Sequence, residues 1–188
     1  LAIRGIAVSR GIAMGRAHKL ERGQPEVAET CIPRARLDDE IDRLRRAIDV
    51  ANMQLKQIRE KIPGSTPTDI AGFIDTHLLM LNDAALSEAT IQIIRSQLCS
   101  AEWALKLQLD TLVTIFDEMD DPYLKTRRDD VIHVVNRILR ILTHMDEELP
   151  LQEESQILNN KIIIADDLTP ADIVLLQHQG MIAFVTES

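Results

Sequence analysis

The sequence is poor in aromatic residues and contains no hydrophobic run of the length needed to cross a membrane. Aromatic residues make up 3% of its 188 residues, which excludes the stacking platforms of single-strand nucleic-acid binders. No apolar run reaches the ~20 residues of a transmembrane helix, and the start lacks the apolar core of a signal peptide. We therefore expect a cytoplasmic protein without a membrane segment.

Cysteine is almost absent as well. Cys31 and Cys99 lie 68 residues apart, a separation that matches no zinc or redox-dithiol motif. We expect both to be free thiols in a reducing compartment. The five histidines are scattered, no pair of them has metal-ligand spacing, and no glycine-rich phosphate loop is present. The residues alone therefore predict no metal, no cofactor and no reaction.

The charge is predominantly of one sign. Lys and Arg number 21 against 30 Asp and Glu, which gives a formal net charge of −9. An acidic surface repels phosphate backbones and anionic lipid, so neither nucleic acid nor membrane is an expected partner. A basic protein surface suits this charge better.

Glycine is missing from most of the chain: none occurs between Gly72 and Gly180, which favours long helices. Apolar residues recur three and four positions apart in three long stripes, over residues 37–62, 91–119 and 124–145. The first stripe keeps a strict heptad spacing. A shorter apolar helix is expected over 68–81. Together these patterns predict an antiparallel helical bundle.

Both ends of the chain differ from this middle. Residues 3–8 and 11–17 predict short strands around a turn, and Lys161–Ala165 predicts a buried strand. Thr169, followed by Pro170 and Asp172, has the pattern of a helix cap. That helix is expected to stop at Gly180, before a strand over 181–185. Strand, helix and strand make a right-handed βαβ unit.

The expected layout is an α-helical bundle inserted into an α/β domain that both chain ends build. We place the first part of the α/β domain at residues 1–33, the bundle at 34–147 and the second α/β part at 148–188.

Three stretches, in chain order, resemble enzyme I of the bacterial phosphoenolpyruvate-dependent phosphotransferase system. They are residues 5–17 (GIAVSRGIAMGRA), residues 120–125 (DDPYLK) with Arg127, Asp130, Val131 and Arg137, and residues 165–172 (ADDLTPAD). The resemblance extends over essentially the whole chain. It implies a helical domain that docks the phosphocarrier protein HPr, inserted into a swivelling α/β phosphohistidine domain. The α/β part is expected to be incomplete here.

The resemblance also implies an activity. Members of the family, the phosphoenolpyruvate-protein phosphotransferases, take a phosphoryl group from phosphoenolpyruvate onto a histidine and pass it to HPr. That histidine lies in a Gly-Gly-x-Thr-Ser-His motif after a strand like 184–187, so we expect it just beyond Ser188. We therefore assign no catalytic residue in this chain, and we expect the chain alone to be inactive. Phosphoenolpyruvate binding, Mg²⁺ and homodimer formation belong to the family's C-terminal half, so no cofactor is expected here.

Site residues follow from the same resemblance. Thr169 would support the active histidine through its hydroxyl. The residues expected to contact HPr are His77, Leu79, Met80, Asp83, Leu86 and Arg127. Simpler interpretations exist for several of these residues, because His77 shares a helical face with core positions, Arg127 lies in a charged cluster and Thr169 is a helix cap.

Two alternatives remain from the sequence. The first is the nitrogen-regulatory paralogue of enzyme I, which uses a different HPr. The second is a non-catalytic helical adaptor whose α/β part is only a scaffold.

Overall fold

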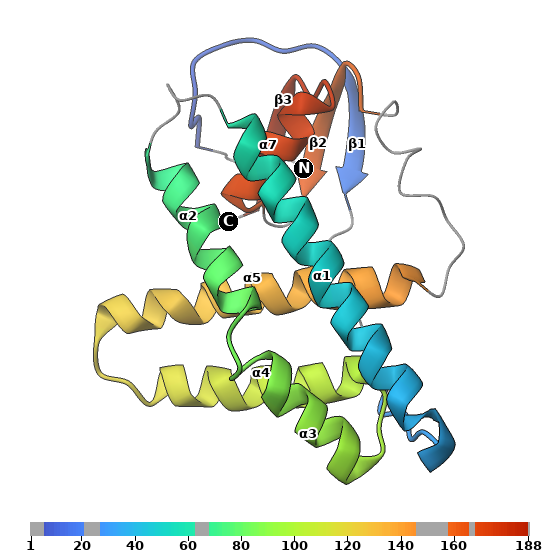
Figure 1. Ribbon diagram of the computed structural model, residues 1–188. Helices are drawn as coiled ribbons and strands as arrows, with labels where there is room; N and C mark the ends of the chain where they lie inside the picture. Colours follow the sequence, from blue (N-terminus) through green and yellow to red (C-terminus); the bar gives the residue numbers. More distant parts are fainter. Residues whose placement is uncertain (1–5, 21–26, 63–67, 146–157, 166–167, 188) are drawn as a thin grey trace, which may run out of the picture.

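The computed structural model describes residues 6–20, 27–62, 68–145, 158–165 and 168–187. A helical bundle lies below a small parallel sheet, as Figure 1 shows. None of the described helices is long and apolar enough to cross a membrane. In chain order the elements are β1 (Arg16–Leu20), the 3-10 helix η1 (Arg34–Arg36), α1 (Leu37–Lys61), α2 (Thr68–Leu81), α3 (Ser87–Gln97), α4 (Ala101–Asp117), α5 (Pro122–Met145), β2 (Lys161–Ala165), α7 (Pro170–His178) and β3 (Ala183–Thr186).

Helix α1 is the central element of the core. Its heptad stripe is buried, with Leu44, Ala51 and Leu55 at 0% exposure, and helices α2, α3, α4 and α5 all pack against it. Burying a leucine side chain contributes about 1.5–3 kcal/mol, so this one stripe supplies a large share of the bundle's stability. The upper part of α1 also contacts α7, beside the sheet (Figure 1). The helices expected over residues 37–62, 68–81 and 124–145 are confirmed as α1, α2 and α5.

The stripe over 91–119 was expected to form one long helix, and that expectation is wrong. The structure has two helices, α3 and α4, with Leu98 in the left-handed region at φ 52°. Ser100 then caps α4, since its side chain accepts a hydrogen bond from the backbone N–H of Trp103 at 3.3 Å. The apolar spacing continues across the break because both helices bury residues in the same core. Periodicity alone therefore does not reveal the turn.

The sheet has the order β1-β2-β3, and both pairings are parallel. The strand, helix and strand expected near the end of the chain are confirmed, with β3 displaced toward Thr186. The expected strands around a turn near the start are wrong within the described residues. No strand occurs over 6–15, and β1 starts only at Arg16. Ile6, Val8 and Ile12 are more than 90% exposed, so their alternating pattern has no surface to pack on.

Gly15 allows the chain to approach the sheet closely. A Cβ there would lie 2.6 Å from the backbone oxygen of Asn160 and 2.7 Å from Cδ1 of Ile182. The backbone at Asn160 cannot shift without a cost in free energy. Residue 15 must therefore lack a side chain for β1 to lie beside β2. By contrast, a Cβ on Gly72, in α2, would meet nothing within 4 Å.

The two glycines give a matched pair of predictions. Gly15→Ala should lower the free energy of unfolding by at least about 1 kcal/mol, because the added methyl overpacks the site. Gly72→Ala should raise it by about 0.5–1 kcal/mol, since glycine is a poor residue inside a helix. Urea denaturation of both variants checks this, and a Gly15→Ala variant as stable as the parent would contradict the close approach.

Candidate functional site

The first turn of α7 holds two side chains in a reciprocal cap. The Thr169 hydroxyl donates to Oδ2 of Asp172 at 2.7 Å, and the Thr169 backbone N–H donates to the same oxygen at 3.2 Å. The backbone N–H of Asp172 donates in return to the Thr169 hydroxyl oxygen at 3.2 Å. This is the capping arrangement that the sequence predicts. It fixes the Thr169 hydroxyl at the end of the segment that follows β2.

An arginine from the bundle reaches the same carboxylate. Nη2 of Arg137, on α5, lies 3.4 Å from Oδ1 of Asp172. Its Nη1 donates to Oε1 of Gln54, on α1, at 3.5 Å. Asp172 is only 5% exposed, so its charge is largely removed from water and depends on these partners. The ion pair therefore connects α7, beside the sheet, to two helices of the bundle.

A second polar cluster lies between α2 and α5. His77 is 3% exposed, and its ring centroid is 4.0 Å from that of Phe73 and 6.4 Å from that of His133. Its Nε2 lies 3.6 Å from Oδ1 of Asp130, too far for a hydrogen bond. Oδ2 of Asp130 accepts a hydrogen bond from Nη1 of Arg127 at 3.0 Å. Arg127 thus holds the carboxylate that faces His77.

Burial governs the protonation of His77. It lowers the pKa of His77 from the ordinary 6.5 to about 4; the Asp130 carboxylate opposes this shift, whereas His133 and Arg137 add to it. The imidazole is therefore neutral at pH 7. A neutral imidazole beside a carboxylate already held by arginine serves packing rather than charge pairing.

The residues expected to contact HPr divide into exposed and buried ones. Leu79 is 75% exposed, Met80 is half-buried and Asp83 is exposed, its Oδ1 accepting from the backbone N–H of Ala85 at 2.8 Å. Of the four consecutive apolar residues at 78–81, Leu79 is thus the one that lies on the surface.

Two of the expected contact residues lie inside the protein instead. His77 is 3% exposed and Leu86 is 4% exposed, so both side chains lie inside the bundle, and their contact with HPr stays a prediction. The reason is helical phase, because His77 falls on the face of α2 that meets α5, and Leu86 packs into the bundle core. Arg127 is half-buried and paired with Asp130.

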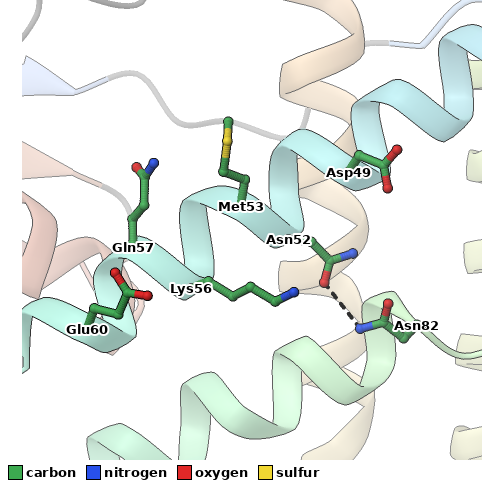
Figure 2. A pocket seen from close by; sticks show the side chains of 7 residues that line it. All are labelled: Asp49, Asn52, Met53, Lys56, Gln57, Glu60 and Asn82. Atoms are coloured by element: carbon green, nitrogen blue, oxygen red, sulfur yellow. Dashed lines mark hydrogen bonds between the residues drawn. The ribbon is translucent and has the colours of Figure 1, made fainter.

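A shallow polar groove of about 530 Å³ runs along α1 next to the end of α2. Figure 2 shows Asn52 directed toward Asn82, whose side-chain amide donates to the Asn52 oxygen at 3.2 Å, while Met53 and Gln57 point away from Asn82 and line the same groove. The groove adjoins the turn that carries Asp83.

The sequence did not indicate that α5 supplies so many of the polar contacts of the two clusters. Asp130, His133 and Arg137 are spaced three and four positions apart, so they form one polar line along that helix. This polar line, beside the buried stripe of the same helix, is the signal that could have indicated their roles. Among the described residues, no group of three or more His, Cys, Asp or Glu could hold a metal ion.

The lowered pKa of His77 predicts a pH-dependent stability. The unfolded chain binds a proton at this residue near pH 6.5 and the folded chain only near pH 4, so the stabilisation is complete above pH 6.5 and declines as the pH falls toward 4. At pH 5 the loss amounts to about 2 kcal/mol relative to pH 8. His77→Gln should reduce the difference between the two pH values by about that amount in urea denaturation. His18→Gln, which removes a histidine outside the cluster, is the control and should retain it.

The ion pair of α7 gives a second prediction. Arg137→Gln should destabilise the protein by about 2 kcal/mol, because a mostly buried Asp172 carboxylate loses a charged partner. Arg45→Gln, at an exposed i,i+3 pair with Asp42, should change the free energy of unfolding by less than about 0.5 kcal/mol. Equal effects of the two substitutions in thermal or urea unfolding would contradict the structural importance of the Arg137–Asp172 pair.

Comparison with known proteins agrees with this architecture. The family model described as PEP-utilising enzyme, N-terminal, matches residues 4–127. The phosphoenolpyruvate-protein phosphotransferase of Cupriavidus necator is 35% identical, over 99% of this chain and 33% of its own length. Its namesake from Bacillus subtilis is 32% identical, over 98% and 31%. The chain thus spans about a third of the length of these relatives.

Two solved structures share the fold. The solution NMR structure of Enzyme I (nEIt) gives a TM-score of 0.75 at 25% identity, covering 98% of this chain and 73% of that one. The N-terminal domain of Enzyme 1 - Nitrogen gives a TM-score of 0.70 at 20% identity, covering 95% and 71%. With the family model matched over most of the sequence, the chain belongs to the N-terminal family of PEP-utilising enzymes.

Proposed function

We propose that this chain is the N-terminal part of a phosphoenolpyruvate-protein phosphotransferase and that it docks the phosphocarrier HPr. The observation that carries the proposal is the packing of α2 on α7. Helix α2 carries the exposed Leu79, and α7 begins with the cap formed by Thr169 and Asp172. A carrier bound on α2 would therefore lie on a helix that packs against α7.

The docking surface is an apolar residue, Leu79, beside the turn that carries Asp83. Leu79 is a large apolar side chain that the bundle leaves in water, which marks a contact site when polar residues surround it. Met80 can repack against a partner. Asp83 and the net charge of −9 favour approach by a basic carrier surface. Arg127 would contact the carrier or the transferring phosphoryl group at the edge of this surface.

Thr169 would support the accepting histidine of the whole protein. Its hydroxyl is held by Asp172, which is held in turn by Arg137. Such a hydroxyl is pre-oriented to hydrogen-bond a nearby imidazole. Catalysis by the whole protein would depend on positioning two histidines in line for phosphoryl transfer and on stabilising charge at the phosphoryl oxygens.

The remaining parts of the reaction are proposed for the whole protein rather than for this chain. They are phosphoenolpyruvate binding, the Mg²⁺ ion and homodimer formation, each of which belongs to the C-terminal half of the family's members. A cytoplasmic location follows from the same proposal, because HPr is the partner that has to be met.

The docking surface can be tested by titrating isotope-labelled chain with HPr and following the backbone amide shifts. Shifts should concentrate on residues 79–86 and around Arg127. Leu79→Ser should weaken HPr binding about ten-fold or more, because the apolar contact is lost. The matched control is Ile115→Ser on α4, another exposed apolar residue, at 46% exposure, which should leave the affinity unchanged.

Each other outcome has a distinct meaning. Binding of the nitrogen-branch carrier in preference to HPr would assign the chain to the nitrogen-regulatory paralogue. Binding of neither carrier by folded chain would overturn the proposal in favour of the helical adaptor. If Leu79→Ser and Ile115→Ser weakened HPr binding equally, the result would contradict a docking surface on α2.

A further inference from the structure

The two cysteines, 68 residues apart in the sequence, face each other across one antiparallel β-bridge. The segment before α1 lies along the turn between α3 and α4. The backbone N–H of Ile32 donates to the carbonyl of Leu98 at 2.7 Å, and the N–H of Ser100 donates to the carbonyl of Thr30 at 2.9 Å. These two bonds flank Cys31 and Cys99. The two cysteines are therefore directly opposed at a position where the two backbones form no hydrogen bond between them.

The geometry of such a pair suits a disulfide. Residues at a non-hydrogen-bonded position have Cα atoms about 4.5 Å apart and side chains on the same face. A disulfide accepts Cα separations of about 4.4–6.8 Å. The bond between the two sulfur atoms therefore requires side-chain rotation, with no change in the path of the backbone.

The two thiols are unequal, as a two-step oxidation requires. Both are free; Cys31 is exposed and Cys99 is buried at 3% exposure. Burial raises the pKa of the Cys99 thiol, and the nearby Cys31 adds to this effect. The exposed thiol is thus the one that an external oxidant reaches, and the buried one can react only with its neighbour.

We infer that Cys31 and Cys99 form a reversible dithiol–disulfide site whose oxidant is a low-molecular-weight disulfide. The Cys31 thiolate attacks one sulfur of that disulfide, whose S–S bond breaks and releases one thiolate. The Cys99 thiolate then attacks the Cys31 sulfur of the mixed disulfide and releases the second. The two protein thiols lose two electrons and two protons, and the oxidant is reduced to two thiols.

The bond would tie two parts of the chain that the backbone hydrogen bonds of Ile32 and Ser100 already join. It would close a loop containing α1, α2 and α3, and it would hold the segment after β1 against the start of α4. Closing a long loop restricts the unfolded chain and so raises the melting temperature. This site is independent of the docking surface on α2 and of the proposed phosphotransferase function.

The test uses the whole chain, which contains no other cysteine. It is incubated with glutathione disulfide, and the intact mass and the cysteine-containing peptides are measured. The expected product is monomeric and lighter by two hydrogen atoms, with Cys31 and Cys99 peptides joined. Its melting temperature should rise by at least about 5 °C and return to the starting value on addition of dithiothreitol.

Two variants separate the roles of the thiols. Cys99→Ala should stop at a stable glutathione adduct on Cys31, and Cys31→Ser should remain unmodified. A parent chain that ends as a glutathione adduct, as a disulfide-linked dimer or with both thiols intact would overturn the inference. These readouts on the parent chain decide the question even where a variant fails to fold.

Discussion

The burial of one stripe along α1 is the constraint on which the rest of the structure depends. Helices α2, α3, α4 and α5 all pack against α1, and so does α7 beside the sheet. Polar contacts of α1 fix the register of this packing. Oε1 of Glu40 accepts from the backbone N–H of Ala101 at 2.8 Å, at the start of α4. Arg43 contacts Glu40, Glu102 and, at 3.0 Å, the carbonyl of Leu142 on α5. A single helix thus sets the positions of the docking surface and of the α7 cap.

Much of this architecture could be predicted from the sequence, because long apolar stripes of constant period dictate helices. The heptad spacing of α1 and the capping pattern at Thr169 were sufficient to place α1 and α7. The pattern was insufficient where two helices bury residues in one core, as at Leu98, and where apolar residues near the start remain in water, as Ile6 and Ile12 do. Periodicity reports what a segment could bury and does not report whether a partner surface reaches it.

The site was less predictable than the fold, since its properties depend on contacts between distant segments. The family pattern drew attention to Arg127 and Thr169, but it could not show that Asp130 holds one and that Asp172 holds the other. Helical phase decides that Leu79 lies in water and His77 does not. The separation of Cys31 and Cys99 concealed their pairing altogether, because a β-bridge joins positions that no local motif relates.

The register of the sheet decides where the helical insertion is joined to it. Leu20 of β1 pairs with Ala165 of β2, and Arg16 pairs with Lys161. The chain therefore leaves the sheet at the carboxyl end of β1 and re-enters it at the amino end of β2, about 13 Å away along the strands. The helical insertion is therefore joined to the sheet at opposite ends of two neighbouring strands, and not at one end of both.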